Sequence, residues 1–255
     1  MVIMVAAAAS ADKSSQRSAV LLEGEELVYN VSYTIIDLGQ IRIRTLEKTR
    51  APDAVTYRGK AYIDSYPSIP FIDAHAVFES RIDTSVFSRH FLGRSQEGDY
   101  WNFSRYTFDY GSRRGILEIG GRDTVVTKRD TIALSGPVQD GLSLFFFARE
   151  HLLSARSHTV PVVIGDEKVS CTIDFRNERS SVEIDAIDYP VDVIHFDGTA
   201  DFVGFYGLTG EFEGWFSNDE ARVPIKAKMR VLIGSVSIEL IEWKRPGWTP
   251  PRGTD

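Results

Sequence analysis

The stretch from Val223 to Leu240 limits what this chain can fold into more than any other part of it. Apolar side chains occupy alternate positions in its first half: Val223, Ile225, Ala227, Met229, Val231 and Ile233. Mostly charged or polar side chains lie between them, and a period of two over so many residues is typical of a β-strand with one buried face. Gly234 and Ser235 interrupt the alternation, and glycine at the first of two turn positions fits a type II′ hairpin. The stretch therefore predicts two antiparallel strands.

A two-residue turn at Gly234 and Ser235 would fix the register of this hairpin. The predicted pairs are Ile233 with Val236, Val231 with Ile238, Met229 with Leu240 and, on the opposite face, Arg230 with Glu239. A slip by one residue would turn the lysines toward the core, so the alternation specifies which side chains are buried. Glu211 to Ser217 predicts a third strand, joined to the hairpin through Asn218 and Asp219, which favour turns.

Further alternating runs predict short strands along most of the chain. They are Gly24 to Ile36, Gln40 to Thr45, Val55 to Asp64, Ala74 to Ile82, Val86 to Arg94, Asp99 to Tyr110, Ile116 to Ile119, Thr124 to Lys128, Thr159 to Ile164, Lys168 to Phe175, Ser181 to Ile184 and Val191 to Phe196. Asp37 to Gln40 is expected to form the turn between the first two strands, and Gly165 with Asp166 a later hairpin turn.

One segment, Asp140 to Ser154, predicts a helix. Leu142, Phe145, Phe146, Arg149 and Leu153 recur at helical spacing along one face of it, and all but Arg149 are apolar. Asp140 can cap its first turn. Because so apolar a helix should be wedged against the sheet, we predict an all-β fold with one main helix. Its architecture would be a curved antiparallel sheet, or a partly open β-barrel, that wraps a central helix.

Composition and the chain ends narrow the class of protein. The formal net charge is −7 and no basic cluster stands out, which argues against nucleic acid as a partner. No apolar stretch approaches the roughly 20 residues that span a bilayer, so no transmembrane segment is expected.

A short apolar run precedes Ala9-Ser10-Ala11, the small-x-small form of a signal-peptidase site; the alternative is an apolar N-terminus without signal function. We expect residues 1–19 to be a signal-peptide remnant and disordered N-terminus, 20–244 a single β-rich domain and 245–255 a disordered proline-rich tail.

Cys171 is the single cysteine of the chain and lies between Val169 and Ile173 on one face of a predicted strand. It is therefore expected to be a small core residue. A lone cysteine forms no disulfide within the chain and is compatible with export to an oxidising compartment.

Several short motifs occur together along the chain. They are G-E-x-L-x-Y-x-V at Gly24 to Val31, Leu38-Gly39, Gln139-Asp140 before the helix, G-x-F-x-G-W-F-S-x-D from Gly210 to Asp219, V-P-I from Val223 and I-G-S-V from Ile233. In this combination the chain resembles the exported bacterial proteins grouped as domain-of-unknown-function family 3108, over roughly Gly24 to Trp243. The resemblance implies an exported, mostly β protein of the Gram-negative envelope, with no established activity. It also implies a shape like the curved sheets of periplasmic lipoprotein carriers, which is a likeness of fold alone.

An apolar binding site is suggested by the loop from Ser65 to Phe71 and by the surplus of aromatic residues. The loop contains two prolines and would expose apolar side chains, which is unusual unless they bind something or fold back over the core. The residues expected to contact an apolar ligand are Tyr66, Ile69, Phe71, Trp101, Phe145, Phe146 and Trp215.

Metal binding and catalysis find little support. Asp73, His75 and Glu79 share one face of a predicted strand, with Asp64 opposite, but their spacing matches no known ligand signature, so no metal site is predicted. Glu211, Glu213 and Asp219 lie near Trp215, a possible sugar platform, which leaves open an envelope hydrolase. Ser143 lacks the context of a nucleophile elbow and is expected in the first helical turn. No catalytic motif or cofactor is predicted.

These observations favour a non-enzymatic exported protein of the periplasm or cell envelope that binds a lipid-like or other apolar ligand in its curved sheet. The alternative is a periplasmic interaction or scaffold protein that meets another envelope protein through an exposed loop or edge strand. An envelope hydrolase is the third possibility.

Overall fold

The computed structural model describes residues 19–51, 54–69, 72–122, 124–203, 209–230 and 234–253. The strands in these ranges are β1 (Glu26–Tyr33), β2 (Ile36–Arg50), β3 (Val55–Ser65), β4 (His75–Asp83), β5 (Ser88–Glu97), β6 (Tyr100–Asp109), β7 (Arg114–Gly121), β8 (Val125–Ala133), β9 (Ser157–Ile164), β10 (Glu167–Val182), β11 (Val191–Val203), β12 (Thr209–Ser217), β13 (Pro224–Arg230) and β14 (Ser235–Lys244), and the helix is α1 (Ser143–His151). The expected signal-peptide remnant up to residue 18, and also Phe71, Val231 and Ile233, lie outside the described residues.

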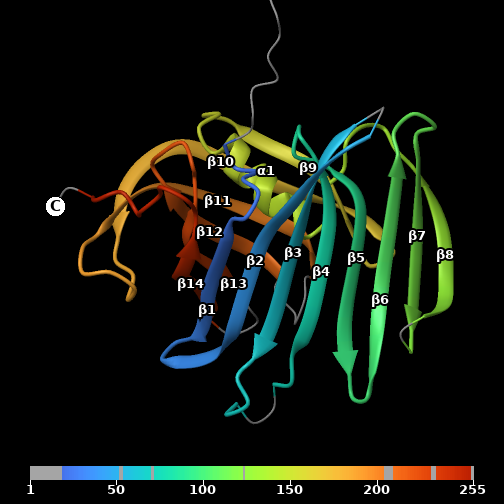
Figure 1. Cartoon of the computed structure of the whole chain (residues 1–255), viewed down its shortest axis with the longest axis horizontal. Helices are drawn as coiled ribbons and strands as arrows, with labels where there is room; N and C mark the ends of the chain where they lie inside the picture. The colour runs from blue at the N-terminus through green and yellow to red at the C-terminus, as the bar shows by residue number, and fades with distance from the viewer. Residues whose placement is uncertain are drawn as a thin grey trace, which may run out of the picture.

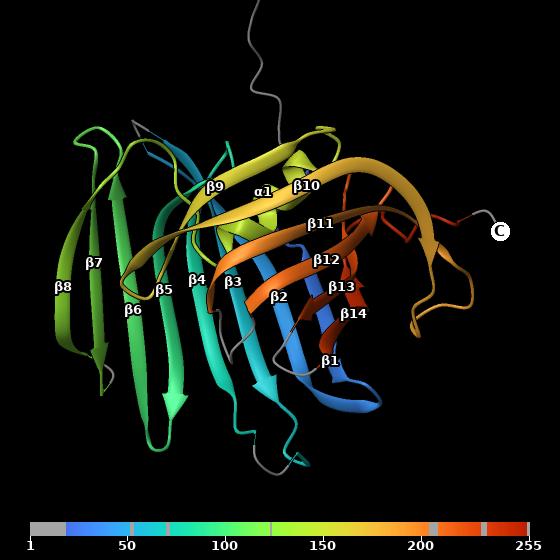
Figure 2. The same cartoon turned by 180° about the vertical axis from the view of Figure 1, so that it is seen from behind.

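The strands form one antiparallel sheet of fourteen strands in the order β8-β7-β6-β5-β4-β3-β2-β1-β14-β13-β12-β11-β10-β9. Two meanders of consecutive hairpins, β1 to β8 and β9 to β14, are joined where β1 pairs with β14. The sheet curls so that β1 to β5 and β9 to β12 lie on opposite sides of α1 (Figures 1 and 2). β8 and β9 are its two edges, so the sheet is not closed into a barrel. The predicted fold class is confirmed.

The concave face of the sheet is filled by α1 and the apolar side chains around it. Phe146 and Leu152 are fully buried and pack in one cluster with residues from both meanders, among them Leu27 and Leu240. The helix comes close to β3 because Gly59 has no side chain there: a Cβ at this position would lie 3.3 Å from the Phe146 ring. The helix therefore fills the concave side of the curved sheet.

A second, smaller apolar cluster fills the space toward the open edges. It consists of Phe91, Tyr106, Phe108, Leu117, Leu134, Val138 and Val163. The backbone before α1 spans this gap, because the carbonyl of Val138 accepts from Ser88 N on β5 and the N–H of Gln139 donates to Pro161 O on β9. Gln139 thereby forms a bridge to Val162 that covers part of the edge of β9.

The hairpin of β13 and β14 confirms the predicted faces but not the predicted register. Ile225 and Leu240 are fully buried, whereas Lys228 is exposed. Met229 pairs with Val236 rather than with Leu240, and Lys226 rather than Arg230 lies opposite Glu239. The predicted register is therefore wrong by four residues. An even shift keeps every side chain on its face, so alternation alone does not determine it.

The turn predicted at Asp37 to Gln40 is wrong, because β2 already begins at Ile36. The chain reverses at Thr34 and Ile35, with a positive φ of 54° at Thr34. Gly39 lies inside β2 opposite Ser65, where a Cβ would be 2.3 Å from the carbonyl oxygen of Asp64. This glycine allows a close strand contact instead of a turn.

The helix is shorter than the predicted range. It begins at Ser143 and ends at His151, so Leu153 lies beyond it and is 51% exposed instead of lining the apolar face. The predicted cap is confirmed, since the Asp140 carboxylate accepts the N–H groups of Leu142 and Ser143 at 2.8 and 2.7 Å. Ser181 and Val182 belong to β10 and do not start a new strand.

The expected disordered tail is instead attached to the body of the protein over residues 245–253. The carbonyl of Pro251 accepts from Asp192 N, and Gly253 N donates to Pro190 O. Trp248 Nε1 donates to Asp219 Oδ2 at 2.8 Å. The prolines do prevent a continuous strand, but individual side chains and carbonyls bind the segment, which the local sequence does not reveal. The proposed domain limits otherwise stay a prediction.

Candidate functional site

The residues expected to bind an apolar ligand lie in three separate places. Tyr66 and Ile69 lie in the loop between β3 and β4. Phe145 and Phe146 belong to α1, where Phe146 is fully buried and Phe145 packs against the core. Trp101 and Trp215 lie on the outer face of the sheet, on β6 and β12. The structure does not bring these groups together, and their role in ligand binding stays a prediction.

The loop rim is the name we give to the β1–β2 turn (Thr34–Ile36) together with residues 65–69 and 72–75 between β3 and β4. Both parts extend from the same end of the sheet (Figure 1). Ser65, Tyr66, Pro67, Ile69, Ile72, Asp73 and His75 line an open pocket of about 470 Å³. Ile35, at the tip of the neighbouring turn, is 96% exposed, and Ile36 is 49% exposed. So much exposed apolar surface at one end is typical of an interaction site.

Specific hydrogen bonds hold the described part of this rim in place. The Tyr66 hydroxyl donates to Asn30 Oδ1 at 3.1 Å, and Asn30 Nδ2 donates to Asp37 Oδ1 at 2.5 Å. Burial and the Asp37 carboxylate raise the pKa of Tyr66. Ser65 Oγ donates to the carbonyl of Ile72 and accepts from the N–H of Ala74, which joins the two ends of the loop. The expected binding lip is therefore attached to β1 and β2 by these bonds.

Acidic side chains surround the rim pocket. His75 Nδ1 lies 2.8 Å from Asp64 Oδ1, and His75 Nε2 lies 3.2 Å from Asp73 Oδ1. Asp64 does lie opposite His75, as predicted. Glu79 instead lies 3.6 Å from Arg58. Within the described residues no group of three or more histidine, cysteine or acidic side chains is arranged to hold a metal ion.

The acids near Trp215 do not converge on one point either. Glu211 pairs with Arg230, Glu213 lies 3.5 Å from His195 on the outer face, and Asp219 is bound by backbone N–H groups and by Trp248. Ser143 begins α1, as expected, and is buried. Cys171 is 1% exposed, and burial, with Asp201, raises its pKa to about 12. The cysteine is therefore a core residue, as predicted.

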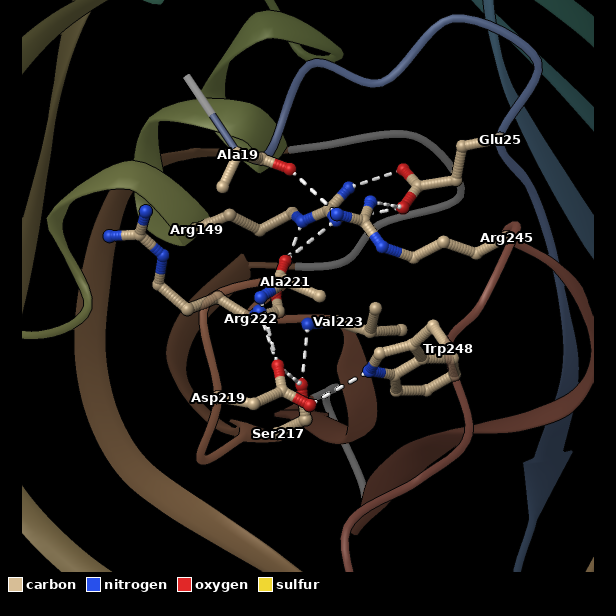
Figure 3. Close-up of polar contacts among 10 residues, drawn as sticks. All are labelled: Ala19, Glu25, Arg149, Ser217, Asp219, Ala221, Arg222, Val223, Arg245 and Trp248. Carbon is tan, nitrogen blue, oxygen red and sulfur yellow. Dashed lines mark hydrogen bonds and ion pairs between the residues drawn. The ribbon is translucent and has the colours of Figure 1, made fainter. Parts of the chain in front are cut away.

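A buried ion cluster on the inner side of the sheet was not recognised from the sequence (Figure 3). Arg149 of α1 binds Glu25 with both ends of its guanidinium group, at 2.7 and 3.0 Å. Arg245 of the tail also binds Glu25 and donates to the carbonyl of Ala19 at 2.8 Å. Burial alone would raise the pKa of Glu25, but the two arginines outweigh it and lower the pKa. The cluster thus joins the N-terminal segment, the helix and the C-terminal segment.

The same arginine also fixes the loop before β13. Arg149 Nε donates to Arg222 O at 3.1 Å and Nη2 donates to Ala221 O at 2.9 Å. Below that loop, Asp219 Oδ1 accepts from Ser217 Oγ and from two backbone N–H groups (Figure 3). The Nε, Nη1 and Nη2 atoms of Arg149 all donate to oxygens of the protein itself. The cluster is therefore a structural anchor and not an open site.

Asp140 forms a comparable anchor at the other end of the helix. Its Oδ2 accepts from Ser80 Oγ at 2.6 Å and from Ser88 Oγ at 2.5 Å, while Oδ1 caps α1. Burial raises the pKa of this carboxyl, although the four hydrogen bonds oppose the effect. Glu25, Asp140 and Asp219 all belong to the short motifs noted in the sequence. These motifs therefore supply side chains that stabilise the fold.

Comparisons with known proteins give one family match and two similar solved structures. The family model described as "Protein of unknown function (DUF3108)" matches residues 28–241. A beta-barrel-like protein of domain of unknown function DUF1849 from Brucella abortus superposes with a TM-score of 0.56 at 11% identity, covering 88% of this chain and 98% of that chain. A proposed exported protein with a YmcC-like fold from Bacteroides fragilis has a TM-score of 0.35 at 9% identity, covering 88% and 97%. No curated protein matches the sequence.

Within the described residues, α1 is too short to cross a membrane, and no other helix qualifies.

Proposed function

This chain belongs to the DUF3108 family, and we propose that it is a non-enzymatic exported protein of the periplasm that binds another envelope protein through its loop rim. The observation that carries the proposal is the packing of the concave face. Phe145 and Phe146, which a ligand inside the sheet would need to contact, instead pack into the core around α1. A binding partner would therefore have to contact the outer surface of the molecule.

The rim has the chemistry of a protein-binding surface. Ile35 and Ile36 project at the tip of the β1–β2 turn, beside the pocket that Tyr66 and Ile69 line. Apolar surface of this kind is usually covered by a partner. The side chains of Asp64 and Asp73 are 59% and 86% exposed next to it. A fitting partner therefore presents an apolar side chain flanked by basic residues.

Quantitative capture from envelope extracts tests this proposal. The tagged protein is compared with an Ile35→Ser, Ile69→Ser double variant, and with Ile116→Ser as a control. Ile116 is also exposed, at 37%, but lies on β7 away from the rim. The partner captured by the parent protein should be retained by the control and lost by the rim variant, while both variants keep the thermal stability of the parent. Equal capture by the rim variant would contradict the proposal.

A further inference from the structure

The outer face of β2 to β6 gathers basic side chains that are scattered in the sequence. Residues directly opposite in antiparallel strands share a face, so the register places these side chains together. They are Arg42 and Arg44 on β2, Arg58 and Lys60 on β3, Arg81 on β4, Arg94 on β5 and Arg105 on β6. We call this surface the basic face; Figure 1 looks onto it, with α1 behind the strands. It stands out in a chain with a net charge of −7.

Acids neutralise the flanks of the basic face and also Arg58, which lies 2.9 Å from Glu47 and 3.6 Å from Glu79. Arg42 and Arg44 bind Glu26 at 2.7 and 2.6 Å, and Arg105 lies 2.5 Å from Glu118. Arg81 and Arg94 are exposed, and within the described residues neither has an ion-pair partner. Arg81 and Arg94 therefore leave positive charge over β4 and β5, beside Glu79 on the same face of β4.

Two arginines also meet directly across neighbouring strands. Arg58 lies opposite Arg81, and Arg81 lies opposite His90 on β5. A pair of like charges destabilises a sheet, and here Glu47 and Glu79, which both lie close to Arg58, offset part of the repulsion. Burial, together with Arg81 and Arg105, lowers the pKa of His90, although Glu79 opposes the effect, so the two arginines outweigh this acid at His90. An anionic partner would relieve the repulsion between these arginines, and this relief would favour its binding.

Aromatic side chains accompany the cations on the same face. Tyr62 pairs with Arg42 across β2 and β3, and the ammonium group of Lys60 lies 5.1 Å from the centre of its ring. Trp101 lies opposite Gln96, next to Arg94 along the same face of β5. Gln40, Arg42, Arg44, Tyr62 and Asp64 line an open pocket of about 310 Å³. Tyrosine and tryptophan favour the boundary between lipid headgroups and water, whereas arginine binds phosphate with two parallel hydrogen bonds.

We propose that the basic face docks onto the surface of a lipid bilayer rich in anionic phosphate headgroups. The cations attract the headgroups, and Tyr62 and Trp101 sit at their level without any segment crossing the membrane. The loop rim lies at one end of the sheet, and Asp64 is shared between the two sites, because it flanks the rim pocket and also lines the pocket of the basic face. The proposal does not depend on the function proposed above.

Vesicle co-sedimentation of the whole protein tests the proposal. Vesicles of phosphatidylcholine with added phosphatidylglycerol are compared with phosphatidylcholine alone, at low and at high salt. Binding should require the anionic lipid and weaken with salt, because exposed charges more than about 10 Å apart are screened at 0.1 M. Equal binding to both vesicles, or none to the anionic ones at low salt, would overturn the proposal.

Substitutions on the basic face locate the contact. Each neutralised cation near an anionic surface should weaken binding roughly fivefold, and the Arg81→Gln, Arg94→Gln double variant roughly 25-fold. Lys168→Gln is the matched control, because Lys168 is exposed on β10, away from the basic face, and should leave binding unchanged. A double variant that stays folded and binds like the parent would refute the assignment. Duplex DNA that competes as well as the vesicles, at equal phosphate concentration, would show a generic polyanion site and also refute it.

Discussion

Glu25 and Glu26 are adjacent residues that allow a sharp comparison of buried and exposed ion pairs. Each carboxylate binds two arginines: Glu25 binds Arg149 and Arg245, whereas Glu26 binds Arg42 and Arg44. The Glu25 side chain is 2% exposed and the Glu26 side chain 21%. The chemistry of the two sites is thus nearly the same, and burial is the main difference between them.

Glu25→Gln should be far more destabilising than Glu26→Gln. Removing the charge of Glu25 leaves two guanidinium groups without a counter-charge, and breaking a buried pair costs about 3–5 kcal/mol. Glu26→Gln should cost only about 0–1 kcal/mol, because its ion pairs are partly open to water, which screens them. For a domain of this size each kcal/mol lowers the melting temperature by roughly 2–4 °C, so Glu25→Gln should lower it by about 6–20 °C.

The acid side of the stability curve gives a second readout for the same variant. The pKa of Glu25 is lowered from its ordinary value of 4.5, so its stabilisation is present at neutral pH and is lost as the pH falls below that value. The gap between the parent and Glu25→Gln should therefore narrow on acidification. Urea unfolding at several pH values measures both effects. Equal losses for the two variants at neutral pH, or a gap that widens in acid, would refute the reasoning.

Three further predictions concern the tail, the core and the cysteine. Ending the chain after Lys244 removes the contacts of Arg245 and Trp248 and should lower the free energy of unfolding by about 3 kcal/mol or more; an unchanged urea midpoint would show that the tail does not contribute. Gly214→Ala should cost about 1–3 kcal/mol, because its Cβ would lie 2.4 Å from the Phe196 ring, whereas Gly141→Ala meets nothing within 4 Å and serves as the control. Cys171, with a pKa near 12, should resist maleimide at pH 8 until the protein is unfolded, and rapid labelling of the native protein would contradict its burial.

The sequence was sufficient to predict which side chains face the core, because alternation in a strand leaves only two choices. Val223 and Ile225 are buried and Lys228 is exposed, as the pattern required. It was not sufficient for the exact strand partners, since a shift by four residues leaves every face unchanged. Gly39 was misread for a related reason: a glycine in a close strand contact and a glycine in a turn look alike until the neighbouring strand is known.

The buried ion cluster could not be predicted from any single stretch of the sequence. Glu25 and Arg149 are 124 positions apart, and Arg245 lies in a proline-rich segment that looks disordered when it is read alone. The G-E motif at Gly24 could have drawn attention to Glu25, because an acid beside an otherwise apolar strand start requires a partner. The basic face was missed in the same way, since its cations come from separate strands.

The most direct test of a sheet packed around its helix is native mass spectrometry of the protein purified gently from cells that produce it. A filled concave face predicts the mass of the polypeptide alone. A lipid that stays bound in one-to-one ratio, and that persists in the Ile35→Ser, Ile69→Ser variant, would show an internal cavity and contradict the account.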